Sequence, residues 1–269
     1  MSGRLIVCPT PIGNLEDVTL RALRALSEAD VIACEDTRTT GKLLARHGIE
    51  GVSLVSCHEH NERRRARELA ERVRRGETVA LASDAGTPGV SDPGYVVIRA
   101  CVEAGLEVEV LPGASSVVTA LVASALPAER WRFTGFLPRK RSELRAELER
   151  DGETLIAFES PRRLAATLAA LAEIDPQRPV AVCRELTKLH EQVARGTASE
   201  LAKQFADGTR GEVVLVIGPA AGDRSAGAVD LEAARGAVER LVEAGARRRV
   251  AASVVSSLVG LPVNKLYGK

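Results

Sequence analysis

The residues best suited to chemistry gather in one stretch between an apolar run and a helical segment. Residues 83–94 read SDAGTPGVSDPG and hold three glycines, two prolines and two aspartates. Proline lacks a backbone donor and glycine weakens regular structure, so this stretch forms neither helix nor strand. It follows the apolar run TVALA and precedes YVVIRACVEAG, which has a helical pattern. The sequence therefore predicts a long shaped loop between a strand and a helix.

Similar loops follow the other predicted strands of the first half of the chain. They read PTPIGNLED, EDTR, CHEHNE and PGASS. In an open α/β sheet, ligands bind outside the carboxyl ends of the strands, where loops meet helix N-termini. Small residues at 85, 86, 113 and 114 would let a ligand approach the backbone, although glycines that only shape turns are the alternative. Neither G-x-G-x-x-G after the first strand nor G-x-x-x-x-G-K-[ST] occurs, which disfavours dinucleotide and P-loop sites.

The elements that must position these loops alternate between strand and helix. This alternation predicts an α/β fold with a parallel-rich sheet and helices on its faces. We expect an N-terminal α/β domain over 1–127 and, after the Trp-containing stretch PAERWRFTGFLP, a second α/β domain over 128–220. The Gly/Ala-rich run PAAGDRSAGA reads as a linker. Residues 229–269 predict a small helical tail of the helix-turn-helix type.

The composition is that of an ordinary globular protein. Hydrophobic residues make up 45%, charged residues 27%, and the net charge is +1. No apolar run approaches the roughly 20 residues that span a bilayer, and no secretory signal is visible. The five cysteines are scattered and odd in number, which favours a reducing compartment. We therefore expect a cytoplasmic protein with no membrane partner.

Eight motifs occur in an order that resembles one known family. They read VCPTPIGNLEDVTLRALRAL, EDTR, SCHEHNE, SDAGTPGVSDPG, LPGASSVVTAL, GFLPRK, ESPRR and RELTKLHE. Together they resemble the bacterial family of ribosomal RNA small-subunit methyltransferase I, a branch of the tetrapyrrole methylase superfamily. The resemblance runs from Leu5 to about Gly218, and the basic tail is similar to the family's C-terminal appendage.

The resemblance implies two α/β domains with S-adenosylmethionine in the cleft between them. It implies 2′-O-methylation of a cytidine ribose in the decoding region of 16S (small-subunit) rRNA, a homodimer, and small-subunit rRNA or the 30S subunit as partner. The nucleotide position and the choice between free rRNA and assembled subunit stay open. S-adenosylmethionine is a sulfonium cation without phosphate, which agrees with the missing P-loop.

The resemblance also assigns cofactor contacts. In the first domain they fall on Pro11, Asp84, Ala85, Gly86, Gly113, Ala114, Ser115 and Ser116, with backbone groups near a helix N-terminus. In the second domain they fall on Phe158, Glu159, Glu185 and Leu186.

Methyl transfer to a ribose hydroxyl requires alignment, helped by a base or by a cation beside the developing oxyanion. The loops EDTR and HEHN supply the candidates Glu35, Asp36, Arg38, His58, Glu59 and Asn61. The alternative for EDTR is a helix cap, with Asp36 or Thr37 accepting from free amides. The stretch CHEH lacks matching ligands for a metal, so no metal is predicted. The identity of any general base stays open.

Two arginine-rich segments could contact RNA. Residues 62–75 hold seven Arg against three Glu, and Arg247, Arg248 and Arg249 precede an apolar helical run in the tail. Cations are disfavoured at a helix N-terminus, so the tail cluster favours an anionic ligand. A solvated helix face is the alternative for both segments. We expect Leu241 and Val242 to cover the apolar face that holds Val250, Val254, Val255 and Leu258.

Two other functions fit the sequence less well. One is a methylase of a corrin or other tetrapyrrole precursor within the same superfamily, but EDTR, HEHN and the basic tail favour the RNA branch. The other is a non-catalytic ribosome-assembly protein that binds RNA, which the intact set of loops disfavours.

Overall fold

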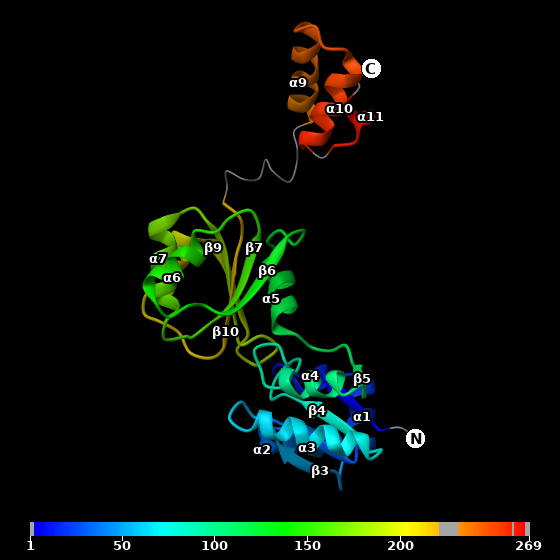
Figure 1. Cartoon of the computed structure of the whole chain (residues 1–269). Coiled ribbons are helices and arrows are strands. Elements are labelled where there is room, and N and C mark those ends of the chain that lie inside the picture. The colour runs from blue at the N-terminus through cyan, green and yellow to red at the C-terminus, as the bar shows by residue number, and fades with distance from the viewer. Residues whose placement is uncertain (1–2, 221–230, 260, 267–269) are drawn as a thin grey trace.

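The computed structural model describes residues 3–220, 231–259 and 261–266, which form two α/β units and a helical tail (Figure 1). The first sheet contains β1 (Arg4–Cys8), β2 (Val31–Cys34), β3 (Ser53–Ser56), β4 (Thr78–Ala82) and β5 (Glu107–Val110). Its strands are all parallel and lie in the order β3-β2-β4-β1-β5. The predicted parallel α/β sheet is thus confirmed for the first unit.

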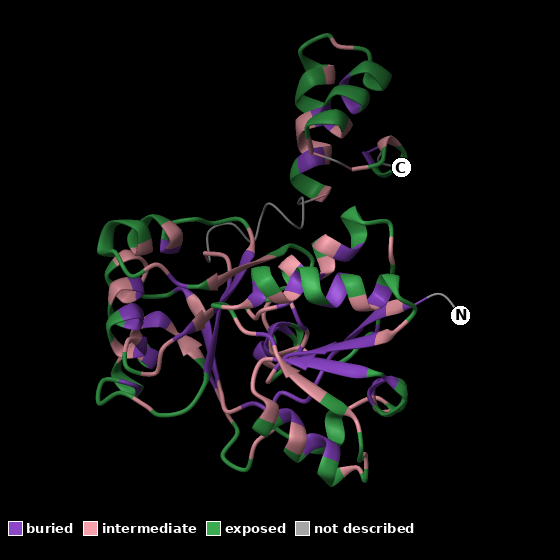
Figure 2. Ribbon diagram, turned by 60° about the horizontal axis from the view of Figure 1, so that its bottom comes forward, coloured by how far each residue is buried: buried purple, intermediate pink, exposed green. Residues whose placement is uncertain are grey.

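Helices cover both faces of this sheet because its strands are apolar on both faces. α1 (Leu20–Glu28) and α2 (Thr37–Arg46) share a core with Ile6 of β1, after a short 3-10 turn, η1 (Leu15–Asp17). α3 (Glu62–Arg74) and α4 (Tyr95–Glu103) share the opposite core with Leu5. Successive side chains of a strand point to opposite faces, so adjacent residues of β1 enter different cores. Figure 2 shows the buried residues concentrated in the strands and on the inner faces of the helices.

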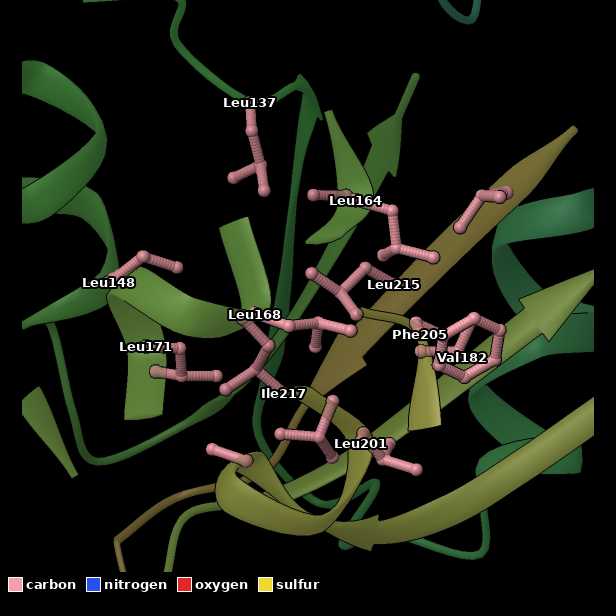
Figure 3. Close-up of a cluster of buried hydrophobic side chains, with 14 of the residues drawn as sticks. Leu137, Leu148, Leu164, Leu168, Leu171, Val182, Leu201, Phe205, Leu215 and Ile217 are labelled. Atoms are coloured by element: carbon pink, nitrogen blue, oxygen red, sulfur yellow. The ribbon is translucent and has the colours of Figure 1, made fainter. Parts of the chain in front are cut away.

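The second sheet is mixed. It contains β6 (Trp131–Phe136), β7 (Thr154–Glu159), β8 (Pro179–Arg184), β9 (Gln192–Thr197) and β10 (Val213–Ile217). The order is β6-β7-β10-β8-β9, and only the β6–β7 pair is parallel. α6 (Arg141–Leu148), α7 (Leu164–Ile174) and α8 (Ala198–Gln204) bury a leucine-rich core on one face, shown in Figure 3.

Helix α5 (Ser116–Ser124) covers the other face of the second sheet. Its residues Val117, Ala120 and Leu121 share a core with Ile156 of β7 and Val214 of β10. The helix lies on the N-terminal side of the boundary expected at 127, yet it packs with the second unit. Its N-terminus therefore stands at the junction of the two units.

The tail contains α9 (Leu231–Glu243), α10 (Arg248–Val259) and α11 (Val263–Leu266), which enclose a small core of their own. The expected packing of the α10 face is wrong for most of its members. Val250, Val254 and Leu258 are exposed, and Ala251, Ala252 and Val255 make the contact instead. Because the alanine side chains are small, α9 and α10 can approach closely along this face of α10, and the face that holds Val250, Val254 and Leu258 then points to solvent. Among the described residues, no helix is long and apolar enough to cross a membrane.

Candidate functional site

The loops at the carboxyl ends of the first sheet are tied to one another. The loops after β1 and β4 pair through Thr10 and Gly86, whose backbone N–H groups each donate to the other's carbonyl oxygen at 2.9 and 3.0 Å. The loops after β2 and β4 join where Asp36 N donates to Asp84 Oδ1 at 3.0 Å. These strands are neighbours in the sheet. The sheet order therefore gathers the loops at one edge, as their positions in the sequence predict.

A cavity of about 470 Å³ opens beside this edge, and both α/β units line it. Predicted cofactor residues that line it are Ala85, Gly86, Ser115, Ser116, Phe158, Glu159 and Leu186. Sequence reasoning missed other lining residues, including Ile12, Thr87, Val90, Ser91, Asp92, Val117, Phe136, Cys183, Glu212 and Val214. Most of these come from the sheet surface of the second unit or from the long loop, where no single motif sets them apart.

The remaining predicted cofactor residues do not line the cavity but support its wall. Pro11 is buried just before Ile12, Asp84 accepts the Asp36 amide, and Ala114 O accepts from Thr87 Oγ1 at 3.4 Å. Gly113 is required for packing, because a Cβ there would lie 2.4 Å from Pro9 Cβ. A larger residue at 113 would therefore disturb the loop after β1 before it met any ligand.

Glu185 and Glu159 have carboxylates that are already engaged within the protein. Glu185 Oε1 accepts from Glu212 N at 2.8 Å and pairs with Lys188 at 3.1 Å. The bond from Glu212 N is the main reason why the pKa of Glu185 lies below its usual value. Glu159 Oε2 accepts from Thr167 Oγ1 at 2.6 Å, and its Oε1 accepts from Ser160 N at 2.7 Å. Both glutamates therefore hold strand ends in place.

The EDTR loop has the geometry of a helix cap. Asp36 Oδ1 accepts from Arg38 N at 2.8 Å, and Asp36 Oδ2 pairs with Arg38 Nη2 at 2.6 Å. The Arg38 side-chain bonds lower the pKa of Asp36 to about 2. Glu35 is half-buried, and burial followed by the charge of Asp84 raises its pKa. The capping alternative thus explains the observed contacts of Asp36 and Arg38.

The HEHN loop is a closed turn. His58 N donates to Asn61 Oδ1 at 2.9 Å, and Asn61 Nδ2 donates to the Ser56 carbonyl at 3.2 Å. Glu59 is exposed. None of the residues proposed as catalytic in EDTR and HEHN lines the cavity. A catalytic role for any of them stays a prediction.

A residue that sequence reasoning passed over fixes the long loop. Glu62 is buried at the start of α3, and its Oε1 accepts from Gly94 N at 2.7 Å and from Val96 N at 3.0 Å. This carboxylate therefore satisfies free amides at the start of α4. It also ties residues 83–94 to the helix beneath them. Glu62 is the last residue of the CHEHNE loop, but nothing in the sequence indicates that it binds the amides of Gly94 and Val96.

Two further lining residues have unusual environments. Asp92 has a pKa raised to about 7, first by burial and then by the negative charges of Glu35, Asp84 and Glu212. Phe136 is 63% exposed, and its ring centroid lies 5.5 Å from that of Phe158. An exposed aromatic ring at a cavity offers a flat face to a planar ligand.

The cavity suits a ligand with a planar apolar part and a charged amino-acid end. Ile12, Val117, Leu186 and Val214 make much of its wall apolar. Ser115 is the N-cap residue of α5, yet its side chain forms no capping bond, so the first amides of that helix are free to meet a carboxylate. Within the described part of the chain, no group of three or more His, Cys, Asp or Glu side chains could hold a metal.

Comparisons with known proteins agree with this architecture. Residues 4–202 match the family model of Tetrapyrrole (Corrin/Porphyrin) Methylases. The chain is 44% identical over 272 residues to ribosomal RNA small subunit methyltransferase I of Mycobacterium tuberculosis (strain ATCC 25618 / H37Rv), covering 99% of this chain and 94% of that protein. It is 47% identical over 219 residues to the protein of the same name from Halalkalibacterium halodurans, covering 80% of this chain and 75% of that one.

Two solved structures with a similar fold are named as a methyltransferase of the tetrapyrrole uroporphyrin III. Uroporphyrin-III-C-methyltransferase from Thermus thermophilus has a TM-score of 0.60 at 26% identity, over 80% of this chain and 94% of that chain. A form of that enzyme complexed with S-adenyl homocysteine has a TM-score of 0.58 at 23% identity, over 80% and 97% of the two chains.

Proposed function

We propose a function for this chain from the premise that it belongs to the tetrapyrrole methylase family and is an S-adenosylmethionine-dependent methyltransferase. The proposed reaction is 2′-O-methylation of a cytidine ribose in the decoding region of 16S rRNA. One observation carries this choice of substrate. The similarity to proteins named for small-subunit rRNA methylation covers 99% of the chain, and it therefore includes the helical tail that follows the two α/β units.

The residues of the cavity would bind and orient the donor. When bound, S-adenosylmethionine supplies a methyl group activated by a positively charged sulfur. The free amides at the start of α5, with Ser115 and Ser116, would hold its carboxylate. The apolar surface formed by Leu186 and Val214 would receive the adenine. Burial between the two units would exclude water and fix the approach of the acceptor, and such positioning can supply a large part of the rate enhancement.

The acceptor nucleotide would enter from the exposed side of the cavity. Phe136 offers a ring on which an unstacked cytosine could lie, since single-stranded bases are commonly recognised by stacking on aromatic side chains. The phosphates on either side of the nucleotide need cations. Arg247 and Arg249 of the tail and the arginines of α3 are the candidates.

Arg248 differs from its neighbours in the tail. Its Nη1 and Nη2 both lie 2.6 Å from the Glu239 carboxylate, and this bidentate pair joins α10 to α9. We therefore assign Arg248 to the tail fold and keep Arg247 and Arg249 as the proposed RNA contacts.

A homodimer is part of the proposal. Val118 and Val122 of α5 and Val110 of β5 are exposed, and β5 is an edge strand of the first sheet. The loop 111–115 connects these two elements, so their apolar side chains belong to neighbouring parts of the chain. A second copy of the same chain would cover these exposed side chains and could extend the area available to RNA.

The test compares acceptors with one donor. The purified full-length protein is incubated with methyl-labelled S-adenosylmethionine and, in parallel, with unmodified 30S subunits, protein-free 16S rRNA and a tetrapyrrole precursor. We expect label only in the RNA, on a ribose. Label in the tetrapyrrole would favour the second candidate, which the fold neighbours support. Donor binding without transfer to any acceptor would favour a non-catalytic RNA-binding role.

A further inference from the structure

We propose that Asp92 accepts the proton of the ribose hydroxyl during methyl transfer. This inference rests on the proposed function, because it requires a hydroxyl acceptor. Three observations carry it: the position of Asp92 in the cavity wall, the backbone contacts that hold its loop, and the absence of a competing partner for its carboxylate.

The loop that carries Asp92 is fixed on several sides. Glu62 accepts from the amides of Gly94 and Val96, which lie within four residues of Asp92 in the chain. Gly89 N donates to the Pro93 carbonyl at 3.2 Å, which closes the turn around Asp92. The pairing of Gly86 with Thr10 fixes the other end of the loop. A proton acceptor must be held in place to act, and these bonds fix the backbone without using the Asp92 side chain.

Asp92 is the carboxylate of the cavity wall that the protein leaves unengaged. Within residues 3–220, 231–259 and 261–266, its oxygens accept no hydrogen bond and form no ion pair. The other two lining carboxylates have partners. Glu159 accepts from Thr167 and Ser160, and Glu212 Oε2 pairs with Lys188 at 3.0 Å.

The charges around Asp92 suit a base that works near neutral pH. Burial raises its pKa to about 7, with smaller contributions from Glu35 after β2, Asp84 after β4 and Glu212 before β10. Lys188, which follows β8, does not neutralise this acidic group freely, because it is already paired with Glu185 and Glu212. A base whose pKa lies near the working pH combines a useful ionised fraction with proton affinity.

The step balances in atoms and charge. The O–H bond of the ribose breaks, and its proton passes to the Asp92 carboxylate. The hydroxyl oxygen forms a bond to the methyl carbon while the carbon–sulfur bond breaks, and that electron pair stays on sulfur. The carboxylate and the sulfonium are both neutral afterwards. Asp92 then returns its proton to water.

The experiment measures single-turnover methylation of 30S subunits against pH for the full-length protein and for Asp92→Asn. We expect the wild-type rate to rise tenfold per pH unit and to level off above about pH 7. Asp92→Asn should lower the plateau by at least about 100-fold, since a general base contributes 10²- to 10⁴-fold. Asp207→Asn makes the same chemical change on an exposed turn outside the cavity and should keep the wild-type profile.

A second measurement separates proton transfer from donor binding. S-adenosylhomocysteine shares the adenosine and the amino acid of the donor but has no charge on sulfur. Asp92→Asn should bind it within about twofold of the wild type. Glu35→Gln removes the negative charge that, among the neighbouring acids, raises the pKa of Asp92 most. This variant should therefore move the midpoint of the pH profile to lower pH.

The outcomes are distinguishable. A wild-type rate in Asp92→Asn would overturn the role of Asp92 and leave the proposed function intact. A parallel loss of rate and of S-adenosylhomocysteine affinity would make Asp92 a binding residue and overturn its role as base. Complete inactivity of the wild type on every rRNA substrate would overturn the proposed function and, with it, the hydroxyl on which Asp92 acts.

Discussion

Carboxylates of the same type behave differently around this cavity because their neighbours differ. Asp36 receives hydrogen bonds from Arg38 and has a pKa near 2, whereas Asp92 is half-buried near other acids and has a pKa near 7. Residue type and motif therefore do not identify the reactive acid. EDTR looked chemically rich in the sequence, but its acid and its arginine mostly satisfy each other.

The raised pKa of Asp92 predicts a dependence of stability on pH. In the unfolded chain this carboxyl has the ordinary pKa of an aspartate, 3.8, so between about pH 4 and 7 the folded protein binds more protons than the unfolded chain. Ionised Asp92 therefore lowers the free energy of unfolding increasingly as pH rises through this range. Asp92→Asn should leave the melting temperature unchanged at pH 4 and raise it at pH 8. Calorimetry at the two pH values checks this, and a variant less stable than the wild type at pH 8 would contradict it.

At the scale of elements, one side chain couples α3 to α4 and to the long loop. Glu62→Ala would leave the amides of Gly94 and Val96 without their acceptor, and we expect a loss of about 1–3 kcal/mol in the free energy of unfolding. Glu62→Gln keeps one acceptor oxygen and should lose less. Urea unfolding measures both variants. Equal stabilities for Ala and Gln would show that the hydrogen bonds to Glu62 contribute little.

The tail allows a matched comparison among adjacent arginines. Replacing Arg247 and Arg249 with Gln should flatten the dependence of log RNA affinity on log salt by roughly 0.7–0.9 per lost phosphate contact. Arg248→Gln should change the slope less, because its guanidinium is paired with Glu239. Filter binding of RNA at several salt concentrations measures the slopes. Identical slopes for all variants would assign the tail a structural role and would favour the arginines of α3.

Sequence patterns marked the strands of the first sheet better than the outer strands of the second sheet. The strands of the first sheet and the three central strands of the second are marked by apolar runs or, for β5, by alternation of valine and glutamate. The strands β6 and β9 have no such mark, and both are edge strands of the second sheet. Edge strands are partly exposed and carry polar residues such as Arg195, so they lack the apolar run that marks a central strand. The packing of α5 on the second sheet was also beyond local pattern, because it depends on residues far along the chain.

The cavity shows the same limit. The order of the motifs predicts that its loops lie at one edge of the sheet. The sequence does not predict a role for Asp92 or Glu62, because the groups around them come from distant segments of the chain. Glu212, for example, lies far along the chain from Asp92, and its negative charge still raises the pKa of Asp92.

At the scale of the whole molecule, the exposed apolar surface of α5 and β5 predicts self-association. Val122 is 74% exposed on α5, and Val122→Lys would place a charge within the proposed contact between two copies. We expect light scattering to show a dimer for the wild type at micromolar concentration and a monomer for Val122→Lys. Val102→Lys on the exposed side of α4 is the control and should stay dimeric. A wild-type monomer would contradict the homodimer.

We propose that this chain methylates a ribose 2′-hydroxyl in the decoding region of small-subunit rRNA. The most direct measurement maps 2′-O-methylation along 16S rRNA from cells that lack the gene, and from the same cells carrying wild-type protein or Asp92→Asn. We predict that one cytidine of the decoding region loses its ribose methyl group in the deletion, regains it with the wild type, and stays unmodified or nearly so with Asp92→Asn. An unchanged methylation map in the deletion strain would contradict the account.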